Sequence, residues 1–364
     1  MGPVILYEKV LEKFGHEVIM PLRPNKRTIE LGAKYSPEFA CFPFKVLMGT
    51  YIQTCERGVD IIVSSGGHGP CRAGFYGEIH KRILKQMGFD VHVVIFDSFF
   101  RNPKKFIKEL RFIRNGKSLI KAIPTALFCY KLLQYIDTVE KRITKIRPYE
   151  KIFGQTDEAF DKINNLLRNT YNYKQLAENS EKCDEILNSI ERHEVEEDDR
   201  IRIGIVGEIY VVMESSVNGE IEKKLNYLGC ETVRSQYLLE WVDFNFFPVK
   251  SKKQHELDIL KKGEEYIEIN IGGHAKQTVG SIADFRDRGF DGIVHLMPFS
   301  CLPELVSQSV IQTLSKEIPV MTLSLDEQTG TANNQTRIEA FVDLLKNKKY
   351  KNKSFSKPLN RRLV

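Results

Sequence analysis

Two segments of the chain, 58–71 and 289–301, follow one pattern that constrains the fold more than any other feature. Each reads glycine, an apolar residue, aspartate, an apolar run and then a turn that ends in a cysteine, Cys71 or Cys301. The cysteine follows the aspartate by eleven residues in the first segment and by ten in the second. A short apolar run between turn residues is typical of a buried strand. The pattern predicts two α/β units with parallel sheets, which resemble a duplicated flavodoxin-like unit. Two ordinary βαβ units with coincidental cysteines are the alternative.

The 364 residues exceed the usual size of a single core, so two domains are expected. We expect buried strands at 15–21, 58–65, 88–97 and 201–207, and helices at 42–56 and 72–87. Residues 101–192 show helical spacing without a convincing strand, interrupted by Pro124 and Pro148, and 192–200 form an acidic connector. The predicted division is an N-terminal α/β lobe at 1–100, a helical segment with its connector at 101–200, a C-terminal α/β lobe at 201–345 and a basic tail at 346–364.

The net charge of +6 comes from the tail, which carries eight Lys and Arg residues and no acid. Without the tail the chain sums to −2, so the body lacks the basic surface that nucleic-acid binding requires. The tail itself is expected to be a solvated, frayed end. The first fifteen residues show no signal pattern, and the most apolar window is too short and too interrupted for a bilayer span. We therefore expect a cytoplasmic protein with neither a nucleic-acid nor a membrane partner.

Seven scattered cysteines argue against a disulfide framework. Ligands of open parallel sheets bind beyond the carboxyl ends of the strands, which is where Cys71 and Cys301 are expected, facing one cleft. Cys41 is the third candidate, because Pro43 places it at the start of a helix. The helix dipole at that position favours the thiolate, which suits a metal ligand or a nucleophile.

The other four cysteines are expected to be small buried hydrophobic residues. Cys55 lies fourteen residues beyond Cys41 on the same expected helix, about 21 Å along its axis. One metal centre therefore cannot use both. The remaining three are Cys129 and Cys183 in the helical segment and Cys230 at the start of an apolar run.

Three thiolates around a cleft suit an iron–sulfur cluster with one iron left open, and soft sulfur ligands favour iron–sulfur or zinc. His68, three residues before Cys71, could supply a fourth ligand, so a Cys3His zinc site is the alternative. A Cys–His nucleophilic pair is disfavoured, because no histidine oriented by an acid accompanies the cysteines.

Five stretches carry a resemblance to a known family. They are RTIELGAKYSPEFACFPFK, GGHGPCRAGFYGE, NIGGHAKQTVG, HLMPFSCLPE and LDEQTGTANNQTRIEAF. Together they resemble the superfamily of 2-hydroxyacyl-CoA dehydratases, benzoyl-CoA reductases and double-cubane cluster proteins, in its activase-related (CoA enzyme activase-like) branch. The resemblance runs from about residue 26 to 345 and names no substrate.

The resemblance implies two Rossmann-like lobes around a 4Fe-4S cluster held by Cys41, Cys71 and Cys301. It also implies an oxygen-sensitive lyase or reductase that receives a low-potential electron from a separate ATP-dependent activator with its own cluster. The electron would serve radical chemistry on a CoA thioester, in a homodimer or heterodimer. The alternatives are a double-cubane cluster, or a non-catalytic iron–sulfur or zinc protein that transfers electrons or partners such an enzyme.

Two departures from the family pattern are visible. His68 stands where relatives tend to have a cysteine, and the Gly-rich strand expected before the first helix is missing from the sequence. The residues expected to cradle the cluster or bind substrate are Gly66, Gly67, Gly69, Arg72, Tyr76, His274 and His295. Glu304 and Glu327 are candidate proton-transfer groups.

Overall fold

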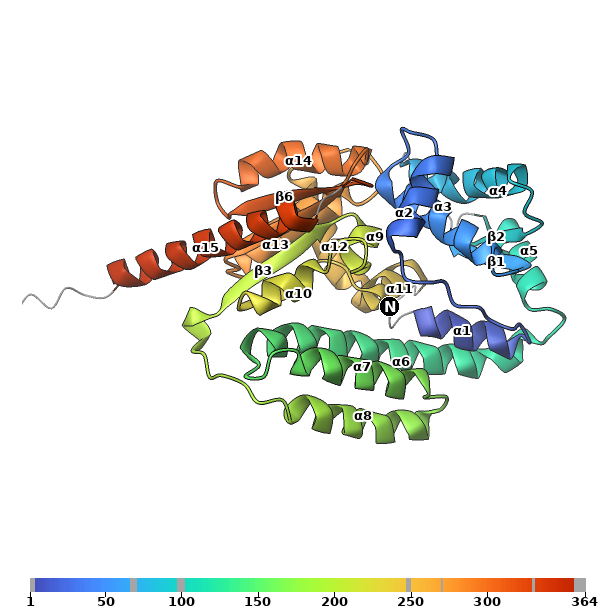
Figure 1. Ribbon diagram of the computed structural model, residues 1–364, viewed down its shortest axis with the longest axis horizontal. Coiled ribbons are helices and arrows are strands. Elements are labelled where there is room, and N and C mark those ends of the chain that lie inside the picture. The colour runs from blue at the N-terminus through green and yellow to red at the C-terminus, as the bar shows by residue number, and fades with distance from the viewer. Residues whose placement is uncertain are drawn as a thin grey trace, which may run out of the picture.

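The computed structural model describes residues 4–65, 71–96, 102–246, 250–269, 271–328 and 331–356. It is an α/β protein with two parallel sheets, one of two strands and one of four, surrounded by many helices (Figure 1). The smaller sheet belongs to the N-terminal part of the chain and the larger one to the C-terminal part. A unit of long helices lies between them in sequence, as expected.

The N-terminal part contains α1 (Val4–Lys13), α2 (Lys26–Tyr35), α3 (Phe42–Cys55), β1 (Ile61–Ser65), a 3-10 helix (Arg72–Phe75), α4 (Tyr76–Gln86), β2 (His92–Phe96) and α5 (Pro103–Ile113). Strands β1 and β2 pair in parallel, with Ile61 opposite His92. Phe44, Met48 and Ile52 of α3 are fully buried with Leu84 of α4. Helix α3 therefore supplies much of this core, and Cys41 lies directly before it.

The expected strand at 15–21 is wrong, because residues 16–25 form an irregular segment. Side chains hold this segment instead of a strand ladder. The Arg57 guanidinium donates to the carbonyl oxygen of Met20 at 2.6 Å, and the His16 ring contacts the carbonyl oxygen of Ile113 at 2.6 Å. Pro21 and Pro24 have no N–H to donate, so they cannot contribute to a ladder.

The helical unit contains α6 (Leu119–Ile146), a 3-10 helix (Arg147–Tyr149), α7 (Gln155–Arg168), α8 (Tyr173–Asn188) and a 3-10 helix (Glu197–Asp199). In Figure 1 the long helices α6, α7 and α8 run side by side along one edge of the molecule. The expected break at Pro124 is wrong, because this proline lies inside α6. It is the sixth residue of the helix, so its missing N–H removes a single bond near the start. Pro148 does mark the end of α6.

The C-terminal part contains β3 (Ile201–Gly207), α9 (Ile209–Met213), α10 (Ile221–Tyr227), β4 (Cys230–Arg234), α11 (Leu238–Phe246), α12 (Lys250–Glu264), α13 (Ala275–Asp287), β5 (Gly292–Pro298), α14 (Leu302–Leu314), β6 (Val320–Leu325) and α15 (Thr331–Ser356). The strand order is β4-β3-β5-β6, and all pairs are parallel. Strand β5 is buried along its whole length. The strand predicted at 201–207 is confirmed as β3.

The basic tail does not begin as a frayed end. Helix α15 continues through residue 356, and it projects from the body in Figure 1. Lys349 on this helix donates to Asp291 Oδ1 at 3.0 Å and to the carbonyl oxygen of Arg200. Residues 357–364 lie outside the described residues. Of the helices in the described ranges, none combines the length and the apolar character that a bilayer span requires.

Candidate metal centre

Three loops that carry a cysteine lie at the ends of structural elements. Cys41 is the residue before α3, and Cys301 is the residue before α14. Cys71 precedes the 3-10 helix that leads into α4. Cys71 follows β1, and Cys301 follows β5, so both lie beyond the carboxyl ends of parallel strands. This is the position that the repeated sequence pattern predicts.

Direct hydrogen bonds join the three loops. The Arg72 guanidinium donates to the carbonyl oxygen of Phe39 at 2.7 Å and to that of Ser300 at 2.6 Å. The Ser300 hydroxyl also donates to the carbonyl oxygen of Phe39, at 2.9 Å. The backbone N–H of Phe42 donates to the carbonyl oxygen of Phe299 at 3.3 Å. Each loop therefore bonds to at least one other through groups next to its cysteine.

The hydroxyl of Tyr76 interacts electrostatically with all three cysteines. Its hydroxyl is hydrogen-bonded to the sulfur of Cys41. Burial is the main cause that raises the pKa of Tyr76, and the thiols of Cys41, Cys71 and Cys301 each raise it further. The hydroxyl therefore lies within electrostatic range of all three sulfur atoms, since charge interactions of this kind fall off with distance.

Burial favours the protonated form of the three thiols, which is opposite to the thiolate expected for Cys41 at the start of α3. Burial raises the pKa of Cys41 to about 11, and it raises the pKa of Cys71 and Cys301 as well. The carboxyl group of Glu208 raises the pKa of each of the three further. A thiol must lose its proton to bind a metal, so metal binding here would release protons. The positive charge of the metal would offset the energetic cost of burying the thiolates.

Gly273, from the stretch NIGGHAKQTVG, packs against Cys71. Its φ of +62° is in the left-handed region that favours glycine. A Cβ at this position would lie 2.5 Å from Cγ of Pro303 and 3.7 Å from the sulfur of Cys71. The first of these distances is a steric clash. Glycine is therefore required for this segment to approach Pro303 of α14, whereas the distance to Cys71 is an ordinary contact.

Two of the histidines predicted as site residues, His274 and His295, have different surroundings. His274 is the residue before α13, and burial lowers its pKa while Glu304 opposes that effect. His295 is fully buried in β5, with Nε2 2.9 Å from Glu304 Oε2 and Nδ1 3.2 Å from the Thr322 hydroxyl. Glu304 also accepts from Thr278 at 3.1 Å. Both ring nitrogens of His295 are thus bonded to protein groups.

Glu208 is an acidic residue of the site that is not among the residues predicted from the sequence. Glu208 accepts hydrogen bonds from the backbone N–H groups of Tyr210 at 3.0 Å and Val211 at 3.1 Å, which caps α9. Burial raises its pKa to about 7. A signal was available, because Glu208 comes directly after the buried strand β3, at the same sheet edge that carries Cys301. Glu327, singled out from sequence, pairs with Lys45 at 2.7 Å.

Several expected ligands and cradle residues lie outside the described residues. They are His68 and the glycines Gly66, Gly67 and Gly69. The four cysteines expected in the core are indeed buried: Cys55, Cys129, Cys183 and Cys230.

Within the described ranges, no three His, Cys, Asp or Glu side chains are grouped closely enough to share one metal ion. An iron–sulfur cluster does not require its cysteine ligands to share one metal ion, because each thiolate binds a different iron. The donor set of three sulfurs from three converging loops fits such a cluster in its chemistry. The sequence matches no protein-family model, and a comparison with curated proteins finds no significant similarity.

Proposed function

We propose that this chain is an iron–sulfur protein in which Cys41, Cys71 and Cys301 hold a 4Fe-4S cluster. The observation that carries the proposal is the convergence of the three cysteine loops, which Arg72 bonds together. These loops come from sequence positions far apart, and nothing in helix or sheet formation requires a cysteine at each of them. Soft sulfur donors favour iron–sulfur or zinc, and three cysteines on three separate loops match no zinc-finger spacing.

The chain's own residues would position and tune the cluster. Tyr76 is hydrogen-bonded to the Cys41 sulfur, and hydrogen bonds to ligand sulfur shift the reduction potential of a cluster. Phe39, Phe75 and Phe299 are exposed beside the three loops, so the rim of the site is apolar. An apolar rim suits the approach of a partner or substrate and limits the access of water.

A bound cluster would supply one-electron chemistry at low potential. In the proposed role, an ATP-dependent activator with its own cluster delivers the electron, and the acceptor is a CoA thioester or a similar small molecule. The strand order β4-β3-β5-β6 supports a flavodoxin-like C-terminal lobe, because it corresponds to the flavodoxin-like order 2-1-3-4. The Rossmann order would instead place the third strand beside the second. The reaction would then be of the dehydratase, lyase or reductase type, in a homodimer or heterodimer.

A second candidate is a non-catalytic iron–sulfur or zinc protein that serves as an electron-transfer subunit. The observation that favours it is burial, since Cys41 and Cys301 are each only 6% exposed. An enclosed centre favours electron transfer over direct binding of a substrate.

The test is anaerobic purification and reconstitution with iron and sulfide, followed by iron, sulfide and zinc analysis and visible absorbance. We expect about four irons per chain. Alanine at Cys41, Cys71 or Cys301 should abolish iron binding and absorbance. Alanine at the buried Cys129 or Cys183 is the matched control and should leave both unchanged. Full iron content in Cys301→Ala would refute the interdomain cluster, and stoichiometric zinc without sulfide would favour the zinc protein.

A further inference from the structure

A pocket of about 640 Å³ lies where the end of α6 meets the connector that follows α8. We call it the connector pocket. Its lining includes Arg200, which directly precedes β3, and Glu231 near the start of β4. It is therefore at the amino ends of the strands, whereas Cys301 lies beyond the carboxyl end of β5. The volume is in the range of sites for small molecules.

The connector pocket is rich in cationic side chains. Four cations and a histidine line it: Arg142, Lys145, Arg192, Arg200 and His193. Its acids are Glu194 and Glu231. Lys145 and Arg192 are exposed, and neither pairs with a carboxylate in the part of the chain that the structure describes. Lys145 comes from α6 and Arg192 from the connector, so these cations belong to two different walls.

The buried acid of the pocket is already neutralised. Glu231 accepts a hydrogen bond from the Tyr149 hydroxyl at 3.2 Å and pairs with Arg200 at 3.5 Å. The Arg200 guanidinium also lies 5.6 Å from the centre of the Tyr149 ring. Arg142 pairs with Asp184 on α8, outside the lining. Arg142 and Arg200 are thus paired, and Glu194 is the remaining acid of the lining, so Lys145 and Arg192 still leave a net positive charge for a ligand to meet.

The connector is held in place by backbone bonds. The N–H of His193 donates to the carbonyl oxygen of Tyr149 at 2.7 Å, and the N–H of Lys151 donates to that of Glu191 at 3.0 Å. An isolated antiparallel bridge pairs Glu150 with Arg192. The backbone positions of Arg192 and His193 are thus fixed before any ligand binds, so binding would have to order only their side chains.

We propose that the connector pocket binds a small molecule that carries two or more phosphate groups. Arginine and lysine are the side chains that bind phosphate best, and unpaired cations on two walls match an anion with charge at more than one point. The proposal is independent of the cluster, because the pocket contains none of the three cysteines.

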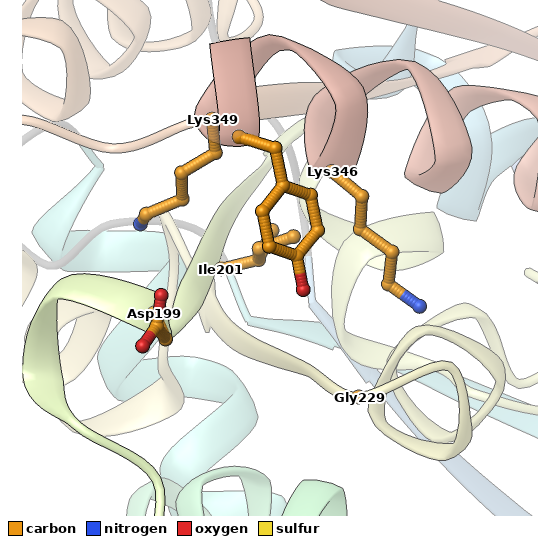
Figure 2. Close-up of a pocket in the computed structure, with 6 residues that line it drawn as sticks. Asp199, Ile201, Gly229, Lys346 and Lys349 are labelled. Atoms are coloured by element: carbon orange, nitrogen blue, oxygen red, sulfur yellow. The ribbon is translucent and has the colours of Figure 1, made fainter. Parts of the chain in front are cut away.

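A smaller pocket nearby, of about 80 Å³, does not present the same arrangement. It is lined by Lys346 and Lys349 of α15 together with Asp199. Figure 2 shows the two lysine side chains pointing away from each other. Lys349 is also already bonded to Asp291 at 3.0 Å. Its cations therefore do not converge on a ligand.

The test is calorimetric titration of the full chain with inorganic tripolyphosphate and, in a second arm, with ATP. We expect both to bind, and Lys145→Ala or Arg192→Ala to weaken binding by about tenfold each, since each removes a charge-assisted contact. Equal affinities would mean that phosphate alone is recognised, and tighter ATP binding would mean that the nucleoside contributes; both support the proposal.

Lys182→Ala is the matched control, because Lys182 is an exposed lysine on α8 outside the pocket lining. It should bind like the wild type. Circular dichroism of each variant checks that it is folded, which is expected since the replaced side chains are exposed. No binding of either probe to the wild type, or equal affinities in the wild type, Lys145→Ala and Arg192→Ala, would overturn the proposal. Because the titration needs no cluster, either result leaves the proposed iron–sulfur function untouched.

Discussion

Arg72 donates a 2.6 Å hydrogen bond to the carbonyl oxygen of Ser300, a residue 228 positions away in the sequence. Ser300 directly precedes Cys301, and Arg72 directly follows Cys71. The same guanidinium donates to the carbonyl oxygen of Phe39, two residues before Cys41. One side chain thus sets the spacing of three cysteine loops. This places Arg72 among the residues that position the candidate ligands.

Arg72→Ala should loosen the three loops with little effect on global stability. Arg72 is exposed, so we expect the free energy of unfolding to fall by about 1 kcal/mol or less. The thiols, however, should react faster with a disulfide reagent, because the loops that cover them separate. Arg82→Ala, at an exposed arginine on α4, is the control and should leave thiol reactivity unchanged. Wild-type reactivity in Arg72→Ala would show that the loops hold their positions without this side chain.

Ser300 has a φ of +62°, a conformation that costs a residue with a Cβ about 1 kcal/mol relative to glycine. Its hydroxyl also donates to Phe39. Ser300→Ala loses the hydrogen bond and keeps the backbone strain, whereas Ser300→Gly loses the bond but relieves the strain. We therefore expect Ser300→Gly to be more stable than Ser300→Ala by about 1 kcal/mol in chemical denaturation.

Ser309 is the control position, because glycine is expected to be less stable than alanine there. It is exposed in the middle of α14, where glycine is less favourable than alanine by about 1 kcal/mol. Ser309→Gly should therefore be the less stable of its pair. The same order at both positions would contradict a role for the left-handed backbone at Ser300.

The sequence predicts the elements around the cysteines well, because buried strands and amphipathic helices have local signatures. Strand β3 and helix α3 begin at or near the expected residues. The strand predicted at 15–21 is wrong because an apolar run can also pack as an irregular segment that side chains hold in place. The bonds from Arg72 to Phe39 and Ser300 could not be predicted, since they depend on how distant loops meet. The repeated cysteine pattern located two of the loops but not the side chain that joins them.

Lys45 and Glu327 form an ion pair of 2.7 Å between α3 and the segment after β6. The Lys45 side chain is 5% exposed and that of Glu327 is 26% exposed. Glu327→Gln leaves a buried ammonium without its partner and should cost about 3 kcal/mol. Lys45→Met leaves Glu327 without its partner, but this side chain is 26% exposed even though its Oε2 is buried. The variant should therefore lose less stability than Glu327→Gln, about 1 kcal/mol. Urea denaturation of both variants measures the difference, and equal losses would contradict this asymmetry.

Asp137 on α6 gives the chain a pH-dependent stability. It is buried, and its carboxylate accepts from the backbone N–H of Leu239 at 3.2 Å. Burial, and then the charge of Glu140, raise its pKa from 3.8 to about 7, against the opposing effects of the Leu239 N–H, Lys141 and Arg234. The folded state therefore binds a proton more tightly than the unfolded state. This contribution is fully present below about pH 4 and is lost as pH rises toward 7.

Asp137→Asn should remove this dependence, because an amide keeps the acceptor for Leu239 but does not titrate. The variant should match the wild type near pH 4 and exceed its stability above pH 7 by up to about 4 kcal/mol. Urea denaturation between pH 4 and 8 measures the difference between the two proteins at each pH, so that other titrating groups cancel. Asp161→Asn, at an exposed aspartate on α7, is the matched control for the same chemical change at the surface, and it should not reproduce the gain in stability above pH 7. If the Asp137→Asn difference does not change with pH, the pKa of Asp137 is the same in the folded and unfolded proteins, and burial does not raise it.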